Sequence, residues 1–252
     1  ADALECPVVC PRHYPDSFPN DHDAFAGTVG MSDHPAATTA LSEAEAVLSV
    51  GVRPSSHEAA VLDDRTPDSV SIVYFDSGQV EFPQSNADAF VNGDLLAVLR
   101  EAADVLSDSA GRTDPDYYAA VRDEATRVRE EVAEYAEEVR EQTPIHPLVL
   151  MTEIREIADD DVIITGDAGA AGGAWPNDAF EYRTTNTFHH SRLYDSMGFP
   201  VPAGNAAKLV DHDRQVVNLI GDGGFLMCNM ELATAAATGT DAVTVVMNDS
   251  KY

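Results

Sequence analysis

Near the end of the chain an apolar strand, a glycine-rich turn, a helix and a second apolar strand follow one another. We expect the strands at Val216–Ile220 and Val243–Met247, and the helix at Phe225–Thr238 with Gly239 as its stop. A strand–helix–strand unit of this length makes the two strands parallel, so that their carboxyl ends lie at one edge of the sheet. Ligands of open α/β sheets bind at that edge.

Two aspartates stand just beyond these strands, one βαβ unit apart. Asp222 and Asp249 would face one crevice, where two carboxylates repel each other unless a cation lies between them. Hard oxygen ligands suit Mg²⁺ or Ca²⁺. Gly221, Gly223 and Gly224 let the backbone approach a ligand closely, and the amides that open the following helix favour an anion. The pattern predicts a phosphate or diphosphate held through a metal ion, although Asp and Gly after a strand are also common turn residues.

The remainder of the chain repeats the alternation of strands and helices, which predicts an α/β fold. A Ser-, Asp- and Gly-rich stretch divides it, and a long helix follows from Pro115 to about Gln142. We expect a domain at 1–107, an interdomain helix or linker at 108–145 and a second domain at 146–252, with both domains truncated. Within them we expect strands at Ala46–Val52, Val70–Phe75 and Val162–Thr165, and helices at Asp94–Leu106, Leu148–Ile157 and Ala203–Val210.

The long helix carries an apolar seam whose members alternate three and four residues apart. Two arrangements bury such a seam: a coiled coil with a second copy, or packing on the helix's own protein. The seam is short and ends at Thr143-Pro144, which favours packing on the same chain. Its members are Tyr118, Val121, Ala125, Val128, Val132, Tyr135 and Val139.

Acidic residues outnumber lysine and arginine by 44 to 15, and the formal net charge is -29. Such a surface repels nucleic acid and anionic membranes, so we expect neither as a partner. The acids are spread along the whole chain, which favours a protein from a salt-loving organism over an acidic interaction protein. Cys6, Cys10 and Cys228 are too few for a disulfide framework, and no run approaches the roughly 20 apolar residues of a membrane span. We therefore expect free thiols and a cytoplasmic location.

The run from Gly221-Asp222-Gly223 to Asn248-Asp249 resembles the motif of thiamine-diphosphate-dependent enzymes, which opens with Gly-Asp-Gly and closes with Asn-Asn or Asn-Asp. Upstream, Gly166–Gly169, Asp195–Ala203 and Leu41–Arg53 resemble segments of the acetolactate synthase and 2-oxo acid decarboxylase superfamily. The resemblance covers most of the chain. It implies two three-layer parallel-sheet domains, a Rossmann-like central domain and a thiamine-diphosphate-binding fold.

The resemblance implies a role for each matching residue. Asp222 and Asp249 would ligate Mg²⁺ through their side chains, and Lys251 would do so through its backbone carbonyl. Met197 would lie under the bent cofactor, and the backbone carbonyl of Asp195 would accept a hydrogen bond from the pyrimidine amine. The residues along the diphosphate would be Gly221, Gly223 and Gly224 on one side and Gly169, Ala170 and Ala171 on the other.

By resemblance, the parent protein decarboxylates a 2-oxo acid and ligates the product to a second carbonyl, and simple 2-oxo acid decarboxylation is the alternative. In this superfamily the glutamate that activates the cofactor sits in an N-terminal domain, usually of a neighbouring subunit. The resemblance therefore implies a homodimer or homotetramer, no catalytic residue in this fragment, and no turnover by this chain alone. The stretch Gly27–His34 resembles the flavin-contacting stretch of acetolactate synthases too loosely to predict FAD.

Two positions depart from the superfamily's pattern. Gly224 stands where a hydroxyl residue is frequent, and Asp249 stands where asparagine is commoner, which adds a negative charge at the metal. His189 and His190 lie shortly before Met197 and are candidate acid–base groups, although nothing in the sequence places them in the cleft.

Two hypotheses from other classes stay open. One is a non-catalytic Mg²⁺-nucleotide-binding α/β module, for which the sequence holds neither a Gly-x-Gly-x-x-Gly nor a Walker motif. The other is an acidic structural protein that interacts through the seam of its long helix.

Overall fold

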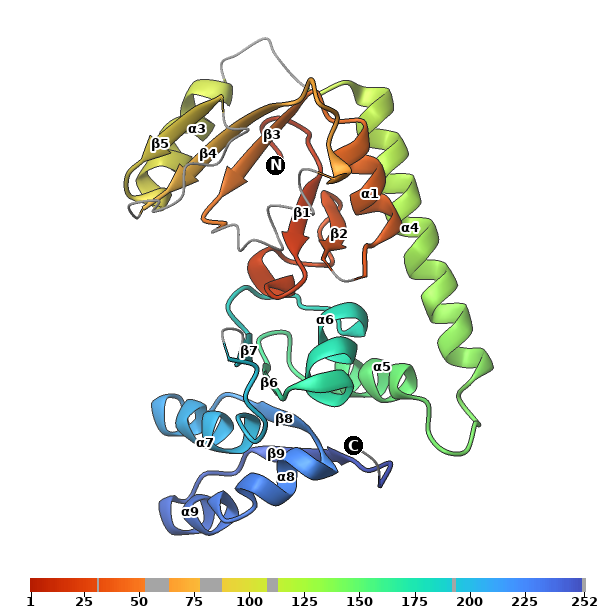
Figure 1. Ribbon diagram of the computed structural model, residues 1–252, viewed down its shortest axis with the longest axis vertical. Helices are drawn as coiled ribbons and strands as arrows, with labels where there is room; N and C mark the ends of the chain where they lie inside the picture. The colour runs from red at the N-terminus through yellow and green to blue at the C-terminus, as the bar shows by residue number, and fades with distance from the viewer. Residues whose placement is uncertain (31, 53–63, 78–87, 108–112, 192–193, 251–252) are drawn as a thin grey trace. The chain divides into compact units, whose positions relative to one another are not determined.

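The computed structural model describes residues 1–30, 32–52, 64–77, 88–107, 113–191 and 194–250. The chain forms two compact units (Figure 1). Unit 1 comprises Ala1–Pro11 and Asp23–Arg129, and unit 2 comprises Arg12–His22 and Glu130–Tyr252. The predicted α/β class with parallel sheets is confirmed. Among the described residues, no helix combines the length and apolar character that crossing a membrane requires.

The described part of unit 1 contains two parallel sheets. In the first, β1 (Val8–Pro11) pairs with β2 (Phe25–Val29); the second has the order β3 (Ala46–Val50), β4 (Ser71–Asp76), β5 (Ala89–Asn92). The helices are α1 (Pro35–Ser42), α3 (Leu95–Ser107) and the first part of α4 (Pro115–Glu138). The expected strands at 46–52 and 70–75 and the expected helix at 94–106 are confirmed, with small shifts at their ends.

Helix α4 packs on its own chain through the first part of its apolar seam. Val121 and Ala125 are buried against Ala36 and Ala40 of α1. The hydroxyl of Tyr117 donates to the carbonyl of Ala40 at 2.7 Å, and burial raises the pKa of this tyrosine to about 12. Packing on the same chain is therefore confirmed for this half.

The second part of the seam behaves differently. Val132 is 40% exposed and Tyr135 is 48% exposed, while Ala136, which is not a seam residue, is buried. The helix ends at Glu138 rather than Gln142, and single turns continue from there toward Pro144. The apolar period alone therefore overestimates both the length and the burial of this helix.

Unit 2 is built on a four-stranded parallel sheet with the order β7–β6–β8–β9. Its strands are β6 (Ile163–Gly166), β7 (Phe188–His190), β8 (Val216–Gly221) and β9 (Val243–Met247). The expected strands at 162–165, 216–220 and 243–247 are confirmed. Its helical segments are η1 (Pro15–Ser17), α5 (Pro147–Ile157), η2 (Ala170–Ala174), α6 (Trp175–Ala179), α7 (Pro200–Val210), α8 (Asp222–Cys228) and α9 (Glu231–Thr238).

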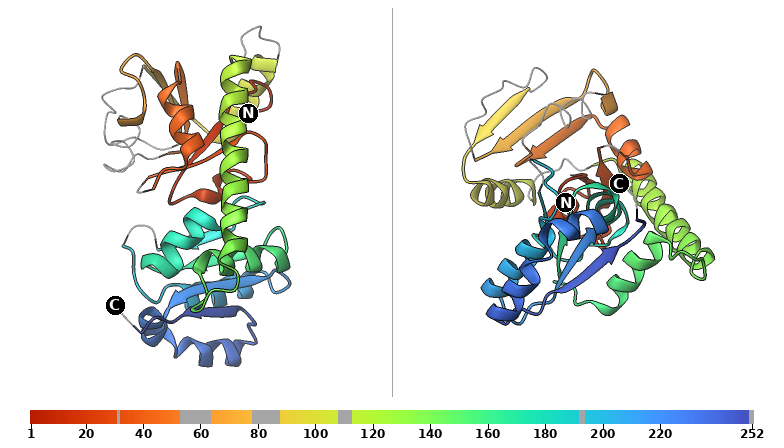
Figure 2. Two further views of the ribbon diagram at one scale, coloured as in Figure 1. Left: turned by 90° about the vertical axis from the view of Figure 1, so that its right-hand side faces the viewer. Right: turned by 60° about the horizontal axis from the view of Figure 1, so that its bottom comes forward.

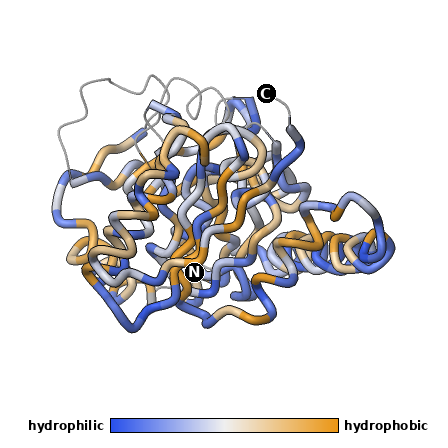
Figure 3. The backbone as a smooth tube through the Cα atoms, turned by 90° about the horizontal axis from the view of Figure 1, so that it is seen from below, coloured by the Kyte–Doolittle hydropathy of each residue, from blue (hydrophilic) through white to orange (hydrophobic). Residues whose placement is uncertain are grey.

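Helices cover both faces of this sheet. On one face, Met151 and Ile154 of α5 pack against Ile164 and Leu219 of the central strands. On the other, Ile220 packs with residues of α7 and α8. Figure 1 and the left view of Figure 2 show α5 and α6 on one side and α7, α8 and α9 on the other. Figure 3 shows the hydropathy along the backbone, with apolar stretches alternating with hydrophilic ones.

The single helix expected at Phe225–Thr238 is wrong. Helix α8 already begins at Asp222, because extended Gly221 serves as the N-cap and a carboxylate in the first turn favours the helix dipole. The chain then tightens at Asn229 and Met230, whose carbonyls accept from residues three positions ahead. This break separates α8 from α9. Gly239 ends α9 with φ 72°, as expected for a glycine stop.

A buried polar network ties α7 to the sheet. The hydroxyl oxygen of Thr165 lies 2.7 Å from Oδ1 of Asn218 and 3.1 Å from the carbonyl oxygen of Pro200, the first residue of α7. The amide of Asn218 donates to the hydroxyl of Thr244 at 3.0 Å. Gly204 of α7 passes so close that a β-carbon there would lie 1.9 Å from Oδ1 of Asn218. The network therefore requires glycine at 204.

Residues 12–22 pack within unit 2, although they lie far from it in sequence. One carboxylate oxygen of Asp16 accepts the backbone N–H groups of Thr187 and Phe188 at 2.8 and 2.9 Å. Asn20 exchanges hydrogen bonds with the backbone of Tyr182. The segment thus satisfies buried backbone donors at the start of β7, and no periodicity in the sequence indicates this.

We expect Gly204→Ala to lower the free energy of unfolding by about 1–3 kcal/mol, the usual cost of overpacking a core. The new methyl group would displace Asn218, which two hydrogen bonds hold in place. Chemical denaturation of this chain measures the change. Ala206→Ser, at an exposed position of the same helix, is the control and should stay within about 0.5 kcal/mol of wild type. Equal stability of both variants would contradict the packing of α7.

We expect Asp16→Ala to lower the free energy of unfolding by at least about 2 kcal/mol, because a buried N–H left without its acceptor costs about 1–3 kcal/mol. Thr187 and Phe188 are each 1% exposed, so water does not readily replace the carboxylate. Denaturant titration tests this, with Asp21→Ala in the same segment as an exposed control. A loss no larger than that of the control would rule out the role given to Asp16.

Candidate functional site

Four backbone segments meet at the carboxyl edge of the unit 2 sheet. Strand pairing aligns Gly166 with Leu219, and Gly221 with Met247, so the segments after β6, β8 and β9 leave the sheet side by side. We call them the β6 loop (Gly166–Ala174), the α8 start (Gly221–Gly224) and the β9 end (Asn248–Ser250). The fourth segment is the Met197 turn (Asp195–Phe199), which precedes α7.

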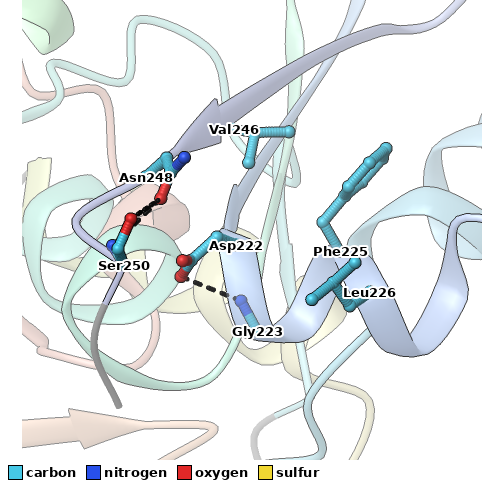
Figure 4. A pocket seen from close by; sticks show the side chains of 7 residues that line it. All are labelled: Asp222, Gly223, Phe225, Leu226, Val246, Asn248 and Ser250. Atoms are coloured by element: carbon cyan, nitrogen blue, oxygen red, sulfur yellow. Dashed lines mark hydrogen bonds between the residues drawn. The ribbon is translucent and has the colours of Figure 1, made fainter.

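A cleft of about 400 Å³ lies between the α8 start and the β9 end (Figure 4). Asp222 lines it from one side, with its Oδ1 accepting the N–H of Gly223 at 2.9 Å. Asn248 and Ser250 line it from the other, where Oδ1 of Asn248 accepts from the N–H of Ser250 at 2.9 Å. Its residues are Asp222, Gly223, Phe225, Leu226, Val246, Asn248 and Ser250.

The structure brings Asp222 together with Asn248 and Ser250, two polar residues to which the spacing argument assigned no role. Asp249 lies between these two and is exposed, but it is not among the residues that line the cleft. Lys251, the third expected ligand, lies outside the described residues. Within the described part of the chain, no three His, Cys, Asp or Glu side chains form a group able to hold a metal.

The β6 loop lies against the α8 start. A β-carbon on Gly221 would be 3.8 Å from the methyl group of Ala171. Gly169 has φ 81° and Gly169 and Ala170 are exposed. Gly172 is buried, and a β-carbon there would lie 1.8 Å from the backbone nitrogen of Asp167. Of the expected cofactor residues in this loop, Ala171 therefore stands beside Gly221, and Gly169 and Ala170 precede it in the same loop.

The Met197 turn also reaches the α8 start. Asp195 has φ 47° and Gly198 has φ 85°, both in the left-handed region. A β-carbon on Gly198 would lie 3.3 Å from Cβ of Cys228 and 3.5 Å from the carbonyl oxygen of Gly224, which sets the turn against α8. The side chain of Met197 is 40% exposed at this place.

Asp167 lies at the centre of this arrangement, although neither its spacing nor the resemblance predicts a role for it. Its side chain is 1% exposed, and its Oδ1 accepts the N–H of Gly198 at 2.8 Å. The backbone N–H groups of Ala168 and Phe199 also favour its charged form. Burial raises the pKa of this carboxyl above its usual value, although the three donors act in the opposite direction. The Gly-Asp dipeptide after an apolar strand, repeated at Gly221-Asp222, was the available signal.

The two candidate histidines lie on β7, next to the β6 loop. His190 pairs with Gly166 across the sheet, and its Nε2 is 3.0 Å from the carbonyl oxygen of Asp167 and 3.5 Å from Oδ1 of Asp195. Its side chain is 5% exposed. Neither His189 nor His190 is among the residues that line the cleft, and their acid–base role stays a prediction.

The arrangement fits a diphosphate held through a hard cation. Asp222 and Asn248 bring carboxylate and amide oxygens to one cleft, which are the ligand types that Mg²⁺ accepts. Gly223 and Gly224 carry no side chain in the first turn of α8; both are buried, and Gly223 lines the cleft. Across from them, the glycine- and alanine-rich β6 loop carries no charged side chain between Ala168 and Ala174. An anion at this point would therefore meet N–H groups and small residues on both sides.

Two family models match the chain. Residues 1–102 match the thiamine pyrophosphate enzyme central domain, and residues 167–252 match the thiamine pyrophosphate enzyme C-terminal TPP binding domain. Thiamine pyrophosphate is the same compound as thiamine diphosphate. The second match includes the four backbone segments of the site described above, apart from Gly166, the first residue of the β6 loop.

Curated relatives point the same way. The acetolactate synthase of Mycobacterium avium is 25% identical over 263 residues, which covers 99% of this chain and 40% of the relative. The catabolic acetolactate synthase of Raoultella terrigena is 26% identical over 230 residues, with 90% and 40% covered. A 3D-(3,5/4)-trihydroxycyclohexane-1,2-dione hydrolase of Clostridium tetani is 24% identical over 241 residues, with 84% and 36% covered. The chain thus spans about two fifths of the length of these relatives, and it belongs to the superfamily of thiamine-diphosphate-dependent enzymes.

Proposed function

We propose that this chain is the thiamine-diphosphate- and Mg²⁺-binding part of an acetolactate-synthase-like enzyme. The observation that carries the proposal is the convergence of the β6 loop, the α8 start, the β9 end and the Met197 turn at one sheet edge. The names of the relatives support ligation of a decarboxylated 2-oxo acid to a second carbonyl. Simple 2-oxo acid decarboxylation is the alternative reaction.

In this proposal each residue of the site binds or orients. Asp222 ligates the metal, together with Asp249 and the carbonyl of Lys251. The amides of the α8 start and of Gly169–Ala171 hold the diphosphate from two sides. When bound, thiamine diphosphate supplies the carbanion that attacks a 2-oxo acid. Met197 and the backbone carbonyl of Asp195 orient the organic rings.

In this proposal Asp249 can ligate the metal only if its side chain changes direction. Its side chain is exposed at the β9 end and has to turn toward Asp222 when a cation binds. Two carboxylates at one site repel each other unless a cation lies between them. Metal binding would then draw the β9 end toward the α8 start.

Catalysis would need more than this chain. The chain spans about two fifths of the length of its relatives and matches their central and C-terminal domains, whereas the resemblance implies that the activating glutamate lies in an N-terminal domain. We propose a homodimer or homotetramer of the parent protein in the cytoplasm of a salt-loving organism, in line with the net charge of -29.

We expect the longest open reading frame that contains this sequence to bind thiamine diphosphate only when Mg²⁺ is present. Asp222→Ala should weaken binding by at least about a hundredfold, because even residues behind a metal ligand contribute about 10–100-fold. Calorimetric titration in molar KCl, with and without Mg²⁺, measures both effects. The matched control is Asp213→Ala, an exposed aspartate outside the site.

Binding that survives in Asp222→Ala, or that does not depend on Mg²⁺, would contradict the metal site. Binding of a nucleotide in place of thiamine diphosphate would favour a nucleotide-binding module instead.

We expect the same complete protein to release CO₂ from small 2-oxo acids, and this chain alone to release none. A carboligase forms one condensation product per CO₂ by joining two carbonyl compounds, whereas a simple decarboxylase forms one aldehyde per CO₂. Product analysis by mass spectrometry separates the two reactions. Turnover by residues 1–252 alone would show that the missing glutamate is not required.

A further inference from the structure

Asp167 contacts the backbone on two sides of the proposed cofactor site. Toward the Met197 turn its Oδ1 accepts the N–H of Gly198 at 2.8 Å, and the N–H of the next residue, Phe199, stabilises its charged form. Within its own loop the N–H of Ala168 acts in the same way. Because a carboxylate is an acceptor with no donor of its own, it can satisfy several converging N–H groups at once.

The second oxygen of Asp167 faces α8. A β-carbon on Gly224 would lie 1.8 Å from Oδ2 of Asp167, far closer than a carbon and an oxygen atom that are not bonded to each other can approach. Gly224 is buried and sits in the first turn of α8, between the cleft residues Gly223 and Phe225. The carboxylate therefore occupies the volume that a side chain at 224 would fill.

We infer that Asp167 is a positioning residue that holds the Met197 turn against the α8 start, and that Gly224 is glycine because Asp167 occupies its side-chain space. The effect of Asp167 on cofactor binding rests on the proposed function. Met197 belongs to the ring end of the proposed site and the α8 start belongs to the diphosphate end. Asp167 then sets the separation between the two ends and touches neither ligand nor metal.

The surroundings of Asp167 suit this role. Its carboxylate is enclosed, since the residue is 1% exposed, and Gly172 packs on its backbone from the opposite side. The His190 ring holds its backbone carbonyl from β7. Asp167 is thus held through both its backbone and its side chain. The position of its carboxylate therefore determines the positions of Gly198 and Phe199. The volume that Asp167 occupies also gives a steric reason for glycine at 224, where a hydroxyl residue is frequent in the superfamily.

The test compares two probes in the longest open reading frame that contains this chain. Asp167→Asn keeps the volume beside Gly224 but replaces one acceptor oxygen by an N–H₂ donor. We expect its affinity for thiamine diphosphate with Mg²⁺ to fall at least about tenfold, in line with the loss of hydrogen bonds to a charged group. Its affinity for inorganic diphosphate with Mg²⁺ should change by less than about threefold. Asp222→Ala, the control, should weaken binding of both probes.

Hydrogen exchange of the ligand-free protein provides a readout that needs no cofactor. The amides of Gly198 and Phe199 should exchange at least about tenfold faster in Asp167→Asn, because a donor to a strong acceptor is protected until that contact opens. Exchange in β8 should be unchanged. If wild type does not bind thiamine diphosphate, the proposed function fails, and the exchange data still decide whether Asp167 holds the turn.

Two results would overturn the inference. One is an unchanged exchange rate at Gly198 and Phe199 in Asp167→Asn. The other is an equal loss of affinity for both probes together with faster exchange throughout unit 2, which would indicate a general structural role.

A second pair of variants tests the steric part. Gly224→Ala should accelerate exchange at Gly198, and Asp167→Ser, which shortens the side chain, should remove the added effect of Gly224→Ala in the double variant. Such non-additivity is expected only for residues in contact. Additive effects of the two substitutions would show that Gly224 is not constrained by Asp167.

Discussion

Strands β6, β8 and β9 pair in parallel, and the three segments that leave their carboxyl ends therefore emerge at the same edge of one sheet. Every candidate contact of the site depends on this pairing. The β6 loop reaches the α8 start because Gly166 is level with Leu219, and Asp222 shares a cleft with Asn248 because Gly221 is level with Met247. A shift of register by one residue would turn the alternating side chains to the opposite faces and separate these groups.

Polar contacts inside the sheet and beneath the loops maintain this arrangement. Asn218 and Thr165 join the first residue of α7 to the central strands. The Met197 turn leads directly into α7, so these hydrogen bonds also fix the end of the turn. Asp167 anchors the same turn from the side. Such buried contacts are costly when only partly satisfied, and each of these groups has its partner. The glycines at 204 and 224 are the steric counterpart, since each leaves room for one of these polar side chains.

Much of the placement of the candidate site residues could be predicted from local patterns. Asp222 and the glycines around it lie where a βαβ unit puts them, and the superfamily shown by the two family models agrees with the motif that ends at Asn248-Asp249. The local pattern did not predict features that depend on the geometry of more than one helix or strand. It could not show that Asn248 and Ser250, rather than Asp249, line the cleft, because the direction of a side chain after a strand end depends on the turn that follows.

The sequence by itself determined the α/β class, the parallel pairing around the Gly-Asp-Gly-Gly turn and the acidic character of the surface. The spacing of apolar residues and the length of a strand–helix–strand unit are local properties of the chain, and net charge is a sum over its residues. Tertiary structure alone decided three other features. Residues 12–22 join unit 2 through Asp16, the expected helix at 225–238 is two helices, and Asp167 lies between the Met197 turn and Gly224. The first and the third depend on contacts between residues far apart in the chain, whose free energy is set by burial and by matching donors to acceptors, which no periodicity records. The helix break is instead local, because the carbonyls of Asn229 and Met230 accept from residues three positions ahead, and the apolar period does not record that either.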